Sequence, residues 1–256
     1  MKNLRFTVFL FTLIALSSFS FAQKPRQNIL GNHLLQTQWG GNGTFCKYSP
    51  ENHTLGCHST AIAQILFYYK LAPTGNVKYH CSNGYTISED FSDYSVDWNK
   101  ITTTLTDTTS QEFIDATARY NYSVACIVQK DFGTNQYVDI NSSNNHKTQI
   151  EEHFTCKYEN YSFNTESTVL EMFQNNKSIN KLIRKEIDSE RPISLYYDGP
   201  NFEGHAIVID GYTIKKRKFY IHANFGWAGS SDGWYLLPND LPKDTNSVIL
   251  LTIRPL

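Results

Sequence analysis

The stretch from residue 55 to residue 73, LGCHSTAIAQILFYYKLAP, constrains the fold most, because it places a cysteine at the start of a helix. Apolar side chains recur there at the spacing of one buried helical face: Ala61, Ile62, Ile65, Leu66 and Tyr69. The helix is predicted to begin near Cys57 and to end before Pro73, which cannot continue it. A thiol in the first helical turn faces unpaired N–H groups and the positive end of the helix dipole. Both favour the thiolate, so we expect Cys57 to be nucleophilic if the chain supplies a base.

Composition restricts the class of protein. The chain has 256 residues, enough for one large domain or two small ones. Hydrophobic residues make up 40% and charged residues 18%, which is typical of a globular protein. The net charge of −1 offers no electrostatic basis for binding nucleic acid, so no nucleic-acid partner is expected.

Residues 1–22 have the pattern of a secretory signal peptide. Lys2 and Arg5 form the charged start, residues 6–16 the apolar run, and residues 20–22 the small-x-small cleavage site. A membrane anchor is the alternative, but the apolar run is short for a bilayer span of about 20 residues. We therefore expect a secreted protein with no membrane association after cleavage. The mature domain would cover residues 23–256, with no evident propeptide.

The chain has five cysteines, and an odd number in an oxidising compartment leaves one unpaired. Cys57 is the natural candidate, although it could itself be a disulfide partner. The other four allow three connectivities, of which we favour Cys46 with Cys81 and Cys126 with Cys156. Paired C-x-x-C spacings are absent from the sequence, so no metal site is expected.

The apolar periodicity changes along the chain. Helices are predicted over residues 111–120, 146–154, 166–174 and 178–190, and a strand over residues 123–128. From residue 193 onward, short β-branched and aromatic runs alternate with turns, at residues 193–197, 205–212, 219–223, 234–237 and 248–254. The basic residues 215–218 fit a solvated hairpin turn. The sequence thus predicts an α+β fold, in which a helical first half packs on a C-terminal antiparallel sheet.

A thiol nucleophile needs a base and a third group that orients the base. His205 opens a predicted strand, and the following hairpin returns Asn224 alongside it, where it can hydrogen-bond the ring. The order Cys, His, Asn is typical of papain-like peptidases. His58 projects about 100° around the helix from Cys57 and is a poor base. His222 is the second candidate for the base.

Three motifs carry a family resemblance: GCHSTAIAQIL around Cys57, GHAIVIDGY around His205 and NFGWAGSSDGWY from Asn224. With LLQTQW and the DWN segment at residues 97–99, they resemble the streptopain family of secreted bacterial cysteine peptidases, which have a papain-like fold. The resemblance implies that Cys57 is the nucleophile, that His205 is the general base and that the Asn224 region orients His205. It also implies a substrate cleft with these residues: Trp39, Asp198, Gly204, Gly226 and Trp227.

The resemblance further implies a monomeric endopeptidase that acts on protein or peptide substrates and needs no cofactor. The chain departs from the family where a glutamine amide usually helps to bind the oxyanion, because Gly41 stands there. Gln38 and Asn42 are the candidates to replace that donor. Phe225 and Asp198 also stand where the family tends to have Trp and Gln. The alternative function is a weak or inactive homologue that binds peptides or inhibits peptidases.

Overall fold

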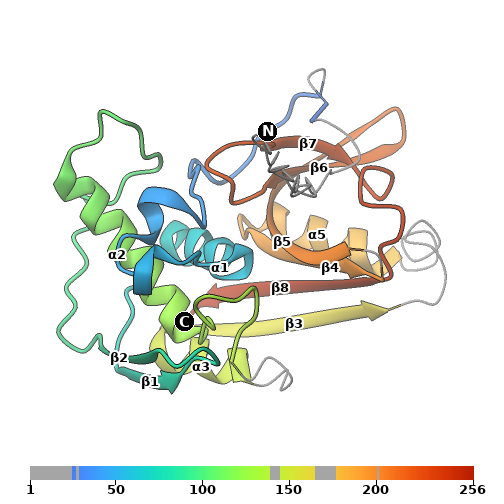
Figure 1. Ribbon diagram of the computed structural model, residues 1–256. Helices are drawn as coiled ribbons and strands as arrows, with labels where there is room; N and C mark the ends of the chain where they lie inside the picture. The colour runs from blue at the N-terminus through green and yellow to red at the C-terminus, as the bar shows by residue number, and fades with distance from the viewer. Residues whose placement is uncertain (1–24, 27–28, 139–144, 165–176, 201) are drawn as a thin grey trace, which may run out of the picture.

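The structure is a computed structural model that describes residues 25–26, 29–138, 145–164, 177–200 and 202–256. The predicted signal peptide and the predicted helix at 166–174 lie outside these ranges. The chain forms an α+β fold in which a helical part packs against an antiparallel sheet (Figure 1). Within the described residues, no helix is both long enough and apolar enough to cross a membrane.

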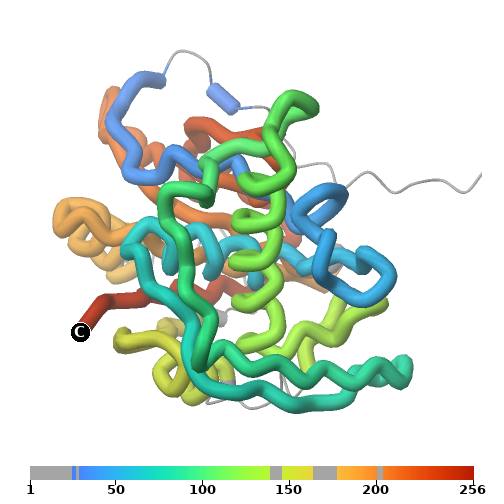
Figure 2. The backbone as a smooth tube through the Cα atoms, turned by 90° about the vertical axis from the view of Figure 1, so that its left-hand side faces the viewer, coloured from blue at the N-terminus to red at the C-terminus, as the bar shows by residue number. Residues whose placement is uncertain are grey.

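The central helix α1 (Cys57–Tyr68) begins and ends as the sequence predicts. Every residue from 59 to 67 is buried, because α1 lies between α2 (Gln111–Ile127) and the sheet. Figure 2 views the molecule from the helical side and shows α2 in front. A central, fully surrounded position explains why nearly every side chain of α1 is apolar or small.

The sheet has six strands in the order β3-β8-β4-β5-β6-β7, and all neighbours are antiparallel. Strands β4 to β7 form the predicted meander, but β8 inserts between β3 and β4. The strands are β3 (Cys156–Asn164), β4 (Ile193–Gly199), β5 (Phe202–Lys215), β6 (Lys218–Asn224), β7 (Gly233–Leu236) and β8 (Ser247–Pro255). The basic residues 215–218 lie at the β5–β6 turn, as expected.

Smaller elements surround this framework. They are the 3-10 turns η1 (Gly43–Cys46) and η2 (Pro50–Asn52), the hairpin β1 (Asn76–His80) with β2 (Thr86–Asp90), and the helices α3 (Asn145–His153) and α5 (Lys177–Asp188). The α3 and α5 helices confirm two of the predictions. Alternate residues of β5 supply two cores: Ala206 and Val208 pack with the α1 side, whereas Ile207 and Ile209 pack with α5.

One prediction of secondary structure is wrong, and strand β3 was not predicted. Residues 123–127 continue α2, which runs for 17 residues, and Val128 follows as its C-cap residue, so the segment forms no strand. Their short apolar run fits a buried helix as well as a strand, and α2 is buried all round in this part. Strand β3 was not expected, because its polar residues interrupt the apolar alternation.

The predicted disulfides are also wrong. All five cysteines lie in the described ranges, and all are free. The thiols face different groups: Cys46 Sγ donates to the Gly41 carbonyl at 3.0 Å, and Cys81 Sγ to the Lys130 carbonyl at 3.8 Å. Neither predicted pair is therefore formed, that is, Cys46 with Cys81 and Cys126 with Cys156.

Candidate active site

Cys57 is the first residue of α1 and is partly exposed. Its Sγ accepts a hydrogen bond from the Ala206 N–H of β5 at 3.4 Å. This contact joins the helix that carries the thiol to the strand that carries His205. Burial raises the pKa of the thiol, and the N–H groups of Ala206, His58 and Cys57 oppose this rise without overcoming it.

The His205 ring is held by a backbone carbonyl. Its Nε2 lies 3.1 Å from the Phe225 oxygen, and a carbonyl oxygen can only accept, so Nε2 carries the proton. Nδ1 is then the basic nitrogen. The ring also packs against aromatic side chains, with its centroid 4.8 Å from that of Trp227 and 5.9 Å from that of Phe225. The carbonyl and the aromatic rings together fix the tautomer and the orientation.

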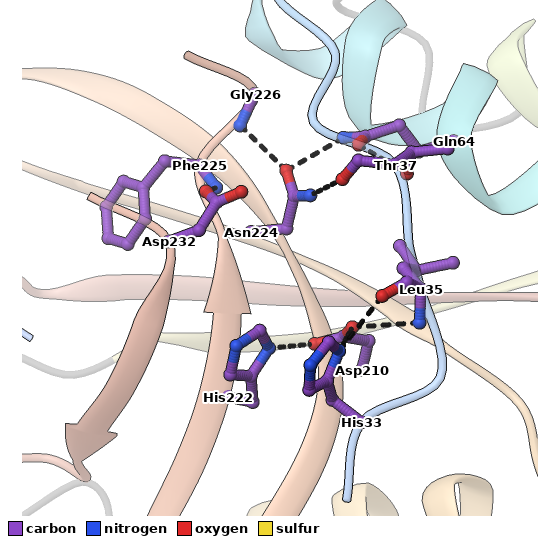
Figure 3. A network of polar contacts seen from close by, with 10 residues as sticks. All are labelled: His33, Leu35, Thr37, Gln64, Asp210, His222, Asn224, Phe225, Gly226 and Asp232. Carbon is purple, nitrogen blue, oxygen red and sulfur yellow. Dashed lines mark hydrogen bonds and ion pairs between the residues drawn. The ribbon is translucent and has the colours of Figure 1, made fainter. Parts of the chain in front are cut away.

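Asn224 lies next to this site, but its side chain has other partners (Figure 3). Its Nδ2 donates to the Thr37 carbonyl at 2.6 Å, and its Oδ1 accepts from Gln64 Nε2 and from the Gly226 N–H, each at 3.0 Å. The expected hydrogen bond to His205 is therefore replaced by the Phe225 carbonyl. Asn224 instead fastens the end of β6 to α1 and to the segment that precedes Trp39.

Burial acts against charge on either member of the pair. It raises the pKa of the Cys57 thiol and lowers the pKa of His205 to about 4. Among the described residues, no hydrogen bond joins Sγ to the imidazole, so the pair rests as a neutral thiol and a neutral ring. Moving the proton from one to the other creates opposite charges, whose attraction in a low-dielectric site offsets the cost of burial.

The side chain of Trp39 does not line a cleft. It is fully buried, and its indole Nε1 donates to the Thr102 carbonyl at 2.8 Å. Its backbone does reach the site, because its carbonyl accepts from the Ala228 N–H at 3.1 Å. Gly40 forms an isolated β-bridge with Trp227. Trp39 therefore anchors the site's loop in the core.

The other expected cleft residues lie on the strand ends and turn around His205. Asp198 is partly exposed and follows Tyr197, which pairs with His205 across β4 and β5. At Gly204, a side chain would collide with the ring of Tyr196. Gly226 has φ +66°, a conformation that suits glycine, and directly precedes Trp227.

Comparison with known proteins identifies the family. The model of the Peptidase C10 family matches residues 39–235. The chain belongs to the Peptidase C10 family. The resemblance drawn from the three sequence motifs is thereby confirmed.

Relatives of this C10 chain include streptopains. It is 28% identical over 198 residues to streptopain of Streptococcus pyogenes serotype M28 (strain MGAS6180), which covers 71% of this chain and 45% of that protein. Streptopain of serotype M1 is also 28% identical over 197 residues, with the same coverage. The chain thus spans about half the length of the curated relatives it matches.

Solved C10 structures share the fold. Active interpain A, a cysteine protease of Prevotella intermedia, superposes with a TM-score of 0.64 at 22% identity, covering 86% of this chain and 93% of that one. A prointerpain A fragment from the same organism gives 0.62 at 21% identity, covering 86% and 70%. The fold is therefore papain-like α+β, as predicted.

Gly41, which stands at the expected position of the oxyanion glutamine, packs against the start of α1. A Cβ built on Gly41 would stand 3.1 Å from Thr60 Oγ1 and 3.4 Å from the Gly56 nitrogen, against the start of α1. Its carbonyl accepts from the Leu55 N–H at 2.9 Å, which fixes the loop there. Gln38 contacts Thr104 through its amide oxygen at 3.5 Å and Asn42 is exposed. Of the candidate donors to the oxyanion, the Cys57 N–H is thus the closest to the nucleophile in sequence.

Sequence reasoning missed several residues that build the C10 site. The Phe225 carbonyl carries no residue-type signal, since any residue has one. Gln64 did have a signal, because it is the one polar residue in the apolar run from 61 to 67. Lys130 and Tyr137 pack against the start of α1, and the sequence analysis singled out neither of them.

His33, Asp210 and His222 form the one group in the described residues whose ligand atoms lie close enough to suggest a metal, within 4.8 Å of one another. The two imidazoles are stacked, with centroids 4.0 Å apart and an interplanar angle of 12°. One ion cannot lie in both ring planes at that spacing, as ligation would require. Both rings instead face the Asp210 carboxylate, His222 Nδ1 at 2.7 Å and His33 Nδ1 at 3.3 Å (Figure 3).

Proposed function

We propose that this chain is a secreted, monomeric cysteine endopeptidase that hydrolyses peptide bonds in proteins. The observation that carries the proposal is the contact between Cys57 Sγ at the start of α1 and the Ala206 N–H beside His205. This contact joins the helix-terminal thiol to the residue next to His205, which supports a shared site because cysteine peptidase chemistry requires a thiol and an imidazole. Secretion is proposed from the signal pattern of residues 1–22.

In the proposed mechanism, His205 Nδ1 takes the proton from Cys57 Sγ, and the thiolate attacks the carbonyl carbon of the substrate. The oxyanion accepts from the Cys57 N–H. The C–N bond then breaks as the imidazolium gives its proton to the departing amine, which leaves an acyl-enzyme. His205 next activates a water molecule, whose oxygen replaces Sγ and releases the carboxylic product. The Phe225 carbonyl, bound to Nε2–H, supports the positive ring throughout. No cofactor takes part in these steps.

One observation favours a second candidate, a weak or inactive homologue that binds peptides in the same cleft. Gly41 supplies no side-chain donor to the oxyanion. The loss of such a donor typically slows the reaction by about two to three orders of magnitude.

The test is casein hydrolysis by the full chain and by Cys57→Ser. Cleavage by wild type that is abolished in the variant supports the peptidase. If neither protein cleaves casein while both bind it, the binding function stands instead. His205→Ala serves as a second variant, since loss of the base should abolish turnover without removing the thiol.

A further inference from the structure

Lys130 is a fully buried lysine with no carboxylate at ion-pair distance among the described residues. Its Nζ donates to three backbone carbonyls, those of Asp131 at 3.2 Å, Thr134 at 2.5 Å and Gln136 at 2.9 Å. A neutral amine has two N–H donors and a lone pair, which would face one of these oxygens. Burial lowers the pKa of Lys130, but three carbonyl acceptors favour the ammonium over the amine, and a buried positive charge needs a counter-charge.

The stem of Lys130 lies against the residue before the nucleophile. A Cβ on Gly56 would stand 3.2 Å from Lys130 Cε and 2.6 Å from the Tyr137 hydroxyl. Gly56 has φ +84°, so the lack of a side chain permits both the backbone turn and this close approach. Tyr137 completes the contact, because its hydroxyl accepts from the Ser59 N–H of α1 at 3.1 Å.

We propose that Lys130 is a positioning residue whose caged ammonium provides the fixed counter-charge for the anion that forms at Cys57. The inference rests on the proposed function, since that anion arises only if Cys57 is the nucleophile. Lys130 adds its field to that of the α1 N-terminus, at the end of the helix where Gly41 supplies no side-chain donor. The carbonyl cage keeps the ammonium from swinging into the cleft, so it acts through space and does not bind the oxyanion.

Other ionisable groups face this part of the site. From the neighbouring elements they are His58 and Cys57 of α1, His205 of β5, Tyr197 of β4, Cys81 after β1, and Asp131 and Tyr137 beside Lys130. Asp131 is the carboxylate among them. Its oxygens accept hydrogen bonds from the N–H and the hydroxyl of Ser82, at 2.8 and 2.7 Å. Asp131 therefore weakens the electric field of Lys130 but forms no direct ion pair with it.

The experiment is the rate of iodoacetamide alkylation of Cys57 against pH, mapped by mass spectrometry on the full chain. Lys130→Met keeps an unbranched stem and removes the charge. We expect it to raise the kinetic pKa of Cys57 by about one unit, a roughly tenfold loss of thiolate at lower pH. Asp131→Asn removes the negative charge, keeps the bond from the Ser82 N–H through Oδ1 and lets Nδ2 donate to the Ser82 hydroxyl, and should move the kinetic pKa the opposite way.

Asn83→Ala is the matched control, because it removes a hydrogen bond to the same loop, from Asn83 Nδ2 to the Phe132 carbonyl at 2.8 Å, and leaves the charge in place. Its kinetic pKa should stay at the wild-type value. A Lys130→Met profile that superimposes on that of wild type overturns the inference. If Lys130→Met does not fold, Asp131→Asn decides, and an unshifted profile again overturns it. An inert Cys57 in wild type would instead overturn the proposed function, and the inference with it.

Discussion

Asn224→Ala separates a structural role for this residue from a catalytic one. The side chain is 3% exposed and makes three hydrogen bonds, with Thr37, Gln64 and Gly226. Its removal leaves a carbonyl, an amide N–H and a backbone N–H buried without partners. At about 1 kcal/mol for each bond, and more where a buried group stays unpaired, we expect a loss of about 3–5 kcal/mol of unfolding free energy.

The assay is equilibrium urea unfolding followed by tryptophan fluorescence, with Asn121→Ala as the matched control. Asn121 is as deeply buried, at 1% exposure, but its amide makes one hydrogen bond, to the Thr117 carbonyl at 2.9 Å. The control should therefore lose about 1 kcal/mol. The alkylation profile of Cys57 in folded Asn224→Ala should match that of wild type, because His205 is held by the Phe225 carbonyl.

The opposite pattern would refute this reasoning. If Asn224→Ala kept its urea midpoint but lost orders of magnitude in peptidase rate, Asn224 would have to bind the His205 ring during the reaction. The Phe225 carbonyl would then describe only the resting state.

Three further predictions concern other parts of the chain. Gly41→Gln places an amide against the start of α1 and should raise kcat on casein by about tenfold or more, whereas no gain would mean that the donor is not limiting. The hydrogen bond to Asp210 raises the pKa of His33 above its value in the unfolded chain. The contact therefore stabilises the fold fully below a pH of about 6.5, and this stabilisation is lost as the pH rises through the pKa of His33 in the folded protein. His33→Asn should therefore lower the melting temperature at pH 6 and not at pH 9; an equal loss at both would exclude the charge. Glu186 is fully buried and paired with Arg191 and Arg254. Glu186→Gln should therefore lower the free energy of unfolding in urea by about 3 kcal/mol. A loss below about 1 kcal/mol would contradict a net stabilising pair.

The central helix and the meander were predictable because each has a strong local signal. The apolar spacing in α1 matches one helical period over several turns, and the strands from β4 to β7 are separated by clear turns. The place of β8 was not predictable. Its position between β3 and β4 depends on long-range pairing, which periodicity does not encode.

The site was predictable as far as its side chains have distinctive chemistry. Cys57 and His205 stand out by residue type and position, but the partner of the ring is a carbonyl, which has no signature in a sequence. Trp39 shows the converse error. An aromatic residue in a recognisable motif suggested a cleft wall, whereas its side chain fills the core and its backbone holds the loop.

The free cysteines make the alkylation measurement selective. Cys46, Cys81, Cys126 and Cys156 are buried, and burial raises the pKa of each thiol, to about 12 for Cys156. Cys57 alone among the five is partly exposed. Burial raises the pKa of Cys57 as well, so the selectivity comes from access: the four buried thiols should react slowly because the reagent does not reach them. A single fast-reacting thiol at neutral pH would therefore report on Cys57, and a second one would mean that a core segment opens on the time scale of the assay.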